Sequence, residues 1–314
     1  MDAPATFGTA EDDLHWLNVK DTPGFVMASI AWLLVFYCDF VVTYMCLYYS
    51  WSYALIIVYN VLVVLSLWSH LKTMLTDPGA VPRAARPLAS ARDAGIPETI
   101  CGRCDAYKPP RSHHCRICNR CIIRMDHHCP WMNNCIGALN QKHFVLFLIY
   151  TWGQCTFALT LLIVRLSECD GTISECFPSE DGRLAISLLV FSLLTLIFVT
   201  SMLYNQVYAV LTGIGTIDRM KRHTRHLHHM PVRWLDVFGI DAAWIAPIDP
   251  KFQDRDRVLG YTTLGNSWKI PHPDDPTATD DDESLGDSQV LDEGKEAEEG
   301  SEPHSPLVVA SALV

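Results

Sequence analysis

The chain has 314 residues, a net charge of −11, 49% hydrophobic residues and a mean hydropathy of +0.14. These values exclude a strongly basic nucleic-acid-binding protein, and we expect no nucleic-acid partner. Residues 274–303 carry thirteen acidic side chains and one lysine, so this segment accounts for the net charge and the remainder is close to neutral. The acidity belongs to a tail, which we predict to be disordered over residues 271–314.

Hydrophobic residues are concentrated in four long runs, each close to the ~20 residues that a helix needs to cross a bilayer. The runs lie at about 25–47, 53–71, 143–164 and 184–208. They predict an all-α integral membrane protein with four transmembrane helices. The acidic N-terminus and the length of the first run indicate a retained anchor rather than a cleaved signal peptide. A soluble bundle of buried helices is the alternative, but four such runs with so few charges are rare in soluble proteins.

The distribution of Lys and Arg predicts the orientation in the membrane. Eleven of them lie between the second and third runs, and Arg219, Lys221 and Arg222 follow the fourth, whereas the loop between runs three and four is acidic. Both termini and the long loop should therefore be cytosolic, in a multi-pass protein of the Golgi or another endomembrane. The cytosol is reducing and favours metal binding by thiols, whereas Cys169 and Cys176 fall in a lumenal loop where a disulfide can form.

These runs set the predicted boundaries. Residues 1–24 form a cytosolic N-terminus, 25–71 the first two helices, 72–142 a cytosolic loop with a zinc-binding core at 99–142, 143–208 the last two helices with the lumenal loop, and 209–270 a cytosolic C-terminal region before the tail. Two polar residues, Asp39 and Gln154, fall inside membrane runs. Each indicates either a functional group or a hydrogen bond between helices.

Seven of the twelve cysteines lie between residues 101 and 135, together with four histidines. Three pairs have the CxxC spacing that lets two thiolates bind one zinc ion from a tight turn. Two tetrahedral sites need eight ligands, so some of the eleven candidates remain for chemistry. The candidates are Cys101, Cys104, His113, His114, Cys115, Cys118, Cys121, His127, His128, Cys129 and Cys135.

The sequence Asp126-His127-His128-Cys129 places an acid, two imidazoles and a thiol together. A neighbouring base raises the thiolate fraction of a cysteine, and a carboxylate can orient that base. The third apolar run begins about eight residues after Cys135. The thiol should therefore lie at the membrane surface, where it can meet a lipid-like acyl donor.

This stretch resembles the cysteine-rich domain of the DHHC family of membrane-bound protein S-acyltransferases, or palmitoyltransferases. The matching positions are Cys101, Cys104, His114-Cys115, Cys118, Cys121, Asp126-His127-His128-Cys129, Pro130-Trp131, Cys135, Asn140 and Phe144. The resemblance extends over roughly residues 20–270. Asp77-Pro78-Gly79 and the short tails look closest to Golgi-type members.

The resemblance implies two structural zinc ions, the first on Cys101, Cys104, His114 and Cys121, and the second on Cys115, Cys118, His128 and Cys135. It leaves Cys129 as the nucleophile, His127 as its base and Asp126 as the residue that orients His127. The implied reaction transfers a long-chain acyl group, such as palmitoyl, from acyl-CoA to cysteines of client proteins through a thioester on Cys129. The acyl chain would occupy an apolar slot between the helices. His113 is left over, as a surface residue or as support for a neighbouring ligand.

The CoA phosphates need cations, and Lys108 and Arg111 are the candidates. The cluster of Arg219, Lys221 and Arg222 suits either CoA or anionic lipid headgroups. Two regions depart from the family. Gly215-Thr216-Ile217-Asp218 stands where the family has Thr-Thr-x-Glu, which puts its bracing of the catalytic region in doubt, and only Val237-Phe238-Gly239 and Asn266 resemble the family's C-terminal packing motif.

Two other functions are compatible with zinc and membrane helices. A membrane-anchored zinc adaptor would bind clients without acyl transfer, but it would have no need of an unliganded His127 and Cys129. A transmembrane ubiquitin ligase of the RING type would need a different ligand spacing, with a longer gap than this sequence has.

Overall fold

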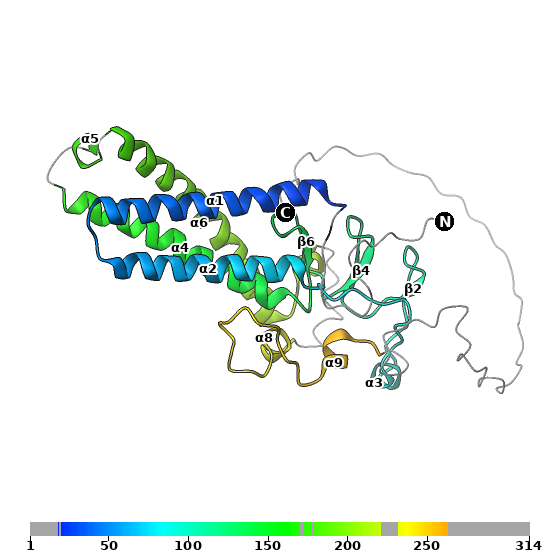
Figure 1. The fold of residues 1–314 in the computed structure, drawn as a ribbon. Helices are drawn as coiled ribbons and strands as arrows, with labels where there is room; N and C mark the ends of the chain where they lie inside the picture. Colours follow the sequence, from blue (N-terminus) through cyan, green and yellow to red (C-terminus); the bar gives the residue numbers. More distant parts are fainter. Residues whose placement is uncertain (1–17, 19, 170–172, 178, 221–231, 263–314) are drawn as a thin grey trace, which may run out of the picture. The chain divides into compact units, whose positions relative to one another are not determined.

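The computed structural model describes residues 18, 20–169, 173–177, 179–220 and 232–262. Within this part of the chain, four helices are long and apolar enough to cross a membrane. They are α1 (Thr22–Tyr48), α2 (Tyr53–Leu75), α4 (Gln141–Ser167) and α6 (Ser179–Thr212), and they lie alongside one another (Figure 1). The predicted fold class is confirmed, with the cysteine-rich region between the second and third of these helices. Each helix runs past its apolar stretch at one end or both, because hydropathy marks only the lipid-facing part of a helix.

Local capping explains where the first two helices begin. Asp21 Oδ1 accepts a hydrogen bond from Gly24 N at 3.1 Å, and Pro23 lies in the first turn of α1. Ser52 caps α2 in the same way, through Ala54 N. Side-chain acceptors at the cap and proline in the first turn both suit the unpaired N–H groups of a helix start.

The outer faces of the helices are apolar, while their contacts include small and polar side chains. Ser66 of α2 and Thr151 of α4 are buried, and their hydroxyls lie 3.2 Å apart. Gln154 donates to the carbonyl of Leu62 at 3.0 Å, so it joins two helices. Such polar contacts hold helices together where lipid gives no hydrophobic driving force. In contrast, Asp39 Oδ1 has no hydrogen-bond partner within the described residues.

A disulfide between Cys169 and Cys176 confirms the prediction for the loop between α4 and α6. Arg165 of α4 donates to the carbonyl of Cys176 at 3.0 Å and lies over the ring of Tyr49. The carboxylate of Asp181 accepts from Tyr44 at 3.0 Å. These contacts join this end of α1, α4 and α6 to the short helix α5 (Ile173–Cys176).

Three two-stranded antiparallel hairpins form the cysteine-rich region at the other end of the helices (Figure 1). They pair β1 (Ile100–Cys101) with β2 (Ala106–Tyr107), β3 (Ser112–Cys115) with β4 (Arg120–Ile123), and β5 (His127–Cys129) with β6 (Asn134–Ile136). A single-turn 3₁₀ helix, Pro130–Met132, connects β5 to β6, and α3 (Ala89–Asp93) precedes β1. Hairpins this short bury little apolar surface, so their stability depends on cross-links such as metal ions.

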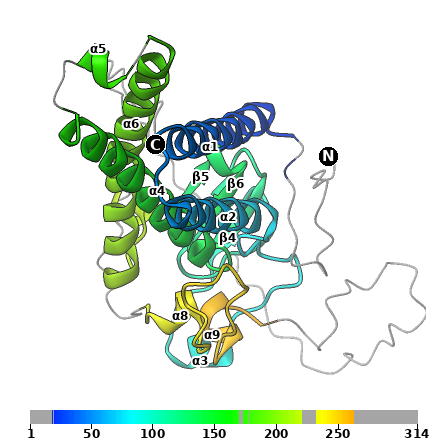
Figure 2. The ribbon, with the colours of Figure 1, turned by 60° about the vertical axis from the view of Figure 1, so that its left-hand side comes forward.

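The C-terminal region contributes three short helices, α7 (Thr216–Met220), α8 (Leu235–Phe238) and α9 (Arg255–Leu259). Figure 2 shows α3, α8 and α9 together below the hairpins. Val237 and Phe238 of α8 pack with Val145 and Val210 of the long helices. Residues 1–17 and the predicted tail lie outside the described residues, as do Lys221, Arg222 and Asn266.

Candidate active site and metal centres

The first predicted zinc site is assembled by two hairpins. His114 and Cys121 face each other across the β3–β4 pair, while Cys101 and Cys104 come from the β1–β2 turn. The four ligand atoms lie within 4.8 Å of one another. Cys104 Sγ lies 3.2 Å from His114 Nδ1 and 3.7 Å from Cys121 Sγ.

The second site repeats this arrangement one hairpin further along. His128 and Cys135 face each other across the β5–β6 pair, and Cys115 and Cys118 come from the β3–β4 turn. Cys118 Sγ lies 3.5 Å from Cys135 Sγ, and His128 Nδ1 lies 3.4 Å from Cys118 Sγ.

Both sets fit zinc. A tetrahedral ion with Zn–S bonds of about 2.3 Å and Zn–N bonds of about 2.0 Å requires ligand atoms about 3.5–3.8 Å apart. The observed separations, 3.2–3.8 Å, fall close to this range. His114 and Cys115 are neighbours on β3 yet serve different sites, because successive side chains of a strand point to opposite faces. Two ions would thus cross-link all three hairpins.

The carboxylate of Asp21 supports the second site. His128 Nε2 donates to Asp21 Oδ2 at 2.9 Å, while Nδ1 faces the sulfurs. A carboxylate behind a metal-binding histidine fixes the orientation of its ring and raises its basicity. Because Asp21 also caps α1, the second site is joined directly to the first membrane helix. This contact was not predicted from the sequence.

We expect Asp21→Asn to weaken zinc binding at the second site by about 10–100-fold, the usual effect of losing such a partner. The first site should keep its affinity, because it contains no group from α1. Competition with a chelator of known affinity, followed by metal analysis, measures both sites. Two sites of unchanged affinity would contradict the role given to Asp21.

Strand alternation separates the two predicted catalytic residues of β5 from the predicted zinc ligand between them. On β5, His127 and Cys129 project to one face and His128 to the other. His127 Nδ1 donates to Asp126 Oδ2 at 2.8 Å. The other ring nitrogen, Nε2, is buried and has no hydrogen-bond partner within the described residues. In this tautomer Nε2 carries no proton, and the Cys129 side chain lies on the same face of the strand.

The surroundings of Asp126 and His127 favour an ionised carboxylate and a protonated imidazole. Burial alone would raise the pKa of Asp126, but the hydrogen bond and charge of His127, with the Thr216 contacts, lower it to about 2. Burial alone would lower the pKa of His127, but Asp126 and Cys129 raise it to about 10. The arrangement therefore stabilises an imidazolium beside the cysteine sulfur.

Two residues beyond the sequence motif hold Asp126 in place. Gln206 of α6, which is 1% exposed, donates to Asp126 Oδ2 at 2.7 Å. The backbone N–H of Thr216 donates to Asp126 Oδ1 at 2.6 Å. The divergent segment from Gly215 to Asp218 therefore still contacts Asp126, through Thr216, the threonine that it retains.

His113 and Asp218 form a second contact in this segment. His113 Nε2 donates to Asp218 Oδ1 at 2.7 Å, and their side chains are 12% and 7% exposed. The His113 side chain is thus largely buried, and its bond to Asp218 joins β3 to α7. A surface position for His113 was therefore wrong.

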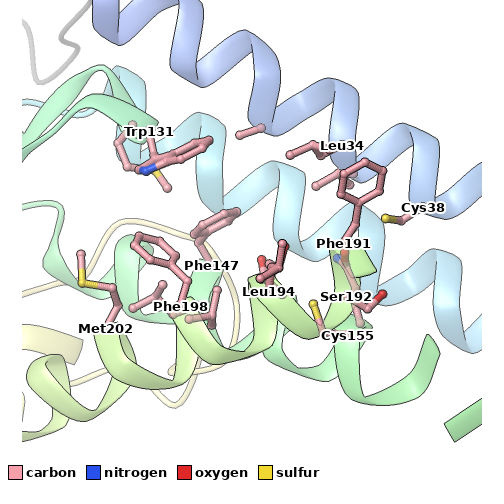
Figure 3. A pocket seen from close by; sticks show the side chains of 18 of the residues that line it. Leu34, Cys38, Trp131, Phe147, Cys155, Phe191, Ser192, Leu194, Phe198 and Met202 are labelled. Atoms are coloured by element: carbon pink, nitrogen blue, oxygen red, sulfur yellow. The ribbon is translucent and has the colours of Figure 1, made fainter. Parts of the chain in front are cut away.

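A cavity of about 260 Å³ extends from Cys129 between all four long helices. Figure 3 shows Trp131 at one end and Cys38 and Cys155 at the other, with Phe147 and Phe198 between them. The other lining residues are mostly apolar, and Cys129 itself belongs to the lining. This space suits a flexible hydrocarbon chain whose reactive end lies at the Cys129 thiol.

Comparison with known proteins agrees with this geometry. A family model described as DHHC palmitoyltransferase matches residues 95–223. The chain is 37% identical to palmitoyltransferase ZDHHC3 of Rattus norvegicus over 246 residues, which cover 73% of this chain and 82% of that protein. It belongs to the DHHC palmitoyltransferase family. Palmitoyltransferase ZDHHC7 of Mus musculus is 41% identical over 69% of this chain and 75% of that protein. Probable protein S-acyltransferase 13 of Arabidopsis thaliana is 34% identical over 60% of this chain and 70% of that protein.

In this DHHC protein the loop after Cys129 is held by His70 of α2. His70 is 1% exposed, accepts from Trp32 Nε1 at 2.9 Å and donates to the carbonyl of Trp131 at 2.9 Å. The roles of His70 and Gln206 were not predicted from the sequence, although both are polar residues within the predicted apolar runs. The signal that selected Asp39 and Gln154 would also have found them.

The basic residues predicted to contact the CoA phosphates lie on different elements of the fold. Lys108 follows β2, on the hairpin farthest from the helices (Figure 1). Burial lowers the pKa of Arg111, while the Asp218 carboxylate opposes this shift, so Arg111 lies near the segment that braces Asp126. Arg219 donates to Asn205 at 3.0 Å and lies over the ring of Tyr208. Arg111 therefore lies near Asp218, and Arg219 packs against α6.

Proposed function

We propose that this protein transfers a long-chain acyl group from acyl-CoA to cysteines of client proteins through a thioester on Cys129. Protein S-palmitoyltransferase activity follows from membership of the DHHC family. The observation that supports the role of Cys129 is its position, since it lines the apolar cavity and shares a strand face with the Asp126–His127 pair.

The first step forms the acyl-enzyme. His127 Nε2 takes the thiol proton, and the Cys129 sulfur attacks the carbonyl carbon of the acyl-CoA thioester. The bond from that carbon to the CoA sulfur breaks, and CoA leaves with the proton that His127 carried. Asp126 keeps the imidazole in the required tautomer and stabilises its charged form.

The second step returns the enzyme to its starting state. The thiol of a client cysteine loses its proton to His127 and attacks the thioester carbon on Cys129. The bond to Cys129 breaks, and the proton returns to the Cys129 sulfur. The products are an S-acylated client and free enzyme, so each cycle consumes one acyl-CoA and releases one CoA.

The cavity explains why this chemistry belongs in a membrane. Each methylene that enters the apolar space is stabilised by ~0.8 kcal/mol relative to water. The CoA moiety must remain outside, where its phosphates need cations. We propose Arg111 as the main contact, with Lys108 in a lesser role because of its distant hairpin.

Zinc has a structural role in this proposal. All four ligand positions of each site are filled by protein side chains, which leaves no open position for a substrate. The second site fixes His128 and Cys135, and these two residues hold the β5–β6 hairpin that carries His127 and Cys129.

We further propose that the hairpins and termini face the cytosol and that the protein resides in Golgi or a related endomembrane. The clustered Lys and Arg next to the hairpin end of the helices support this orientation. The disulfide at the opposite end, between Cys169 and Cys176, agrees with an oxidising lumen there.

The test uses purified full-length protein with an alkyne-tagged palmitoyl-CoA. Wild type should gain close to one label per chain, removable by neutral hydroxylamine, which cleaves thioesters. Cys129→Ser should lose this label, because the hydroxyl is a far weaker nucleophile than a thiolate. Cys46→Ser provides a matched control, since Cys46 is fully buried in α1 and does not line the cavity.

Loss of label in both variants would reflect misfolding, which zinc content and thermal stability would reveal. A folded, zinc-replete wild type that takes no label would reject the proposal. Client binding without acyl transfer would then favour the zinc adaptor.

A further inference from the structure

The segment after α8 exposes large apolar side chains although it has no regular structure. We define this α8 loop as residues 239–249. Ile240, Trp244, Ile245 and Ile248 are 53%, 44%, 77% and 47% exposed. Single exposed hydrophobic residues are common in proteins, but four within nine residues indicate a surface that is covered by a membrane or by another molecule.

Contacts with α4 place this loop at membrane depth. The hydroxyl of Tyr150 donates to the carbonyl of Ile245. Tyr150 lies eight residues beyond Lys142, so it is about 12 Å further along the helix. Its neighbours Ile149 and Trp152 are 43% and 42% exposed, within a helix apolar enough to span the membrane. Ile245 therefore lies at the level of lipid-facing residues.

Side chains of α4 pair with backbone carbonyls of the loop. Lys142, which is only 2% exposed, donates to the carbonyls of Ala243 at 3.1 Å and Ile248 at 3.0 Å. With the Tyr150 bond, side chains of α4 thus pair with three carbonyls of the loop. Irregular backbone at membrane depth is tolerated only where its polar groups have such partners.

The acidic residues of the loop are also paired. Asp249 accepts from Lys72 of α2 at 2.7 Å and from His143 of α4 at 3.0 Å. Asp241 lies 4.0 Å from Lys251. The Asp249 contacts fasten one end of the apolar segment to α2 and α4, and with the Asp241–Lys251 pair they leave the segment free of unpaired charge.

We propose that residues 240–248 are an interfacial anchor that inserts its apolar side chains into the lipid layer beside α4. The bilayer is the occupant because the exposed side chains lie next to the lipid-facing residues of α4 and at their depth. Tryptophan favours the boundary between headgroups and acyl chains, the level at which Trp244 would lie. The anchor is independent of the acyl-transfer mechanism.

A fluorescent amino acid in place of Ile245 tests the anchor. The full-length protein is reconstituted in phosphatidylcholine vesicles, with a nitroxide either on the lipid or on a water-soluble carrier. The same label at Ile149 serves as the lipid-facing control. Ile100, which is 63% exposed on β1, serves as the control in the aqueous region.

We expect the lipid nitroxide to quench the label at 245 as strongly as at 149, and several-fold more than at 100. Quenching by the water-soluble nitroxide instead would overturn the anchor. A label protected from both quenchers would also overturn it, because a client or a second copy of the chain would then cover the loop. Zinc content verifies folding, and a label at Ile248 repeats the measurement at a second exposed position.

Discussion

Replacing Cys135 by alanine is expected to destabilise the cysteine-rich region strongly. Cys135 is fully buried, and its sulfur lies 3.5 Å from that of Cys118. A structural zinc site contributes about 10–16 kcal/mol of apparent binding free energy, as much as the whole stability of a typical domain. Loss of one thiolate therefore removes the second ion and releases the β5–β6 hairpin.

Zinc content and thermal unfolding of the detergent-purified protein measure this effect. Wild type and Cys129→Ser should each contain close to two zinc ions per chain, because Cys129 projects to the face opposite His128. Cys135→Ala should contain one or none and should unfold at a much lower temperature. Cys46→Ala is the matched control, since it removes a fully buried thiol that binds no metal. Two retained ions in Cys135→Ala would show that the ligand set is wrong.

The four membrane helices could be predicted from sequence because each needs only a long apolar run. Their ends could not, since α6 begins at Ser179 and ends at Thr212, several residues outside the apolar run at 184–208. The disulfide was predictable because its two cysteines lie seven residues apart in one loop. Local patterns were sufficient for these features.

The contacts that position the active site depend on packing between distant segments. Asp21 and His128 are 107 residues apart, and Gln206 and Asp126 are 80 apart. No local spacing predicts such pairs, because they exist only after the helices have assembled against the hairpins. The divergent motif at Gly215 to Asp218 gives a further example, because its altered side chains suggested that the contact with the catalytic region was weakened. Thr216, the threonine that the segment retains, nevertheless contacts Asp126, and its backbone N–H donates to Asp126 Oδ1.

Replacing Asp126 by asparagine is expected to slow acyl-enzyme formation by about 10⁴-fold, the scale seen when a triad carboxylate becomes an amide. Both carboxylate oxygens of Asp126 accept hydrogen bonds, from His127 and Gln206 on one side and from Thr216 on the other. An amide must turn its NH₂ toward one of these donors. In either orientation the NH₂ group faces a donor, and that hydrogen bond is lost. If the NH₂ group faces His127, the imidazole proton moves from Nδ1 to Nε2, and Nε2 can no longer accept the Cys129 proton.

Gln206→Leu separates the positioning of Asp126 from its charge. This variant retains the carboxylate and most of the side-chain volume but removes the 2.7 Å bond from α6. A net hydrogen bond to a charged group contributes about 1.5–3 kcal/mol, so we expect a rate loss of roughly 10–150-fold. Single-turnover labelling should show lower rates in both variants at unchanged zinc content. The acyl-CoA concentration for half-maximal rate should also stay constant, because neither residue lines the cavity. A wild-type rate in Asp126→Asn would exclude Asp126 from the mechanism, whereas a shift in acyl-CoA affinity alone would place both residues in substrate binding.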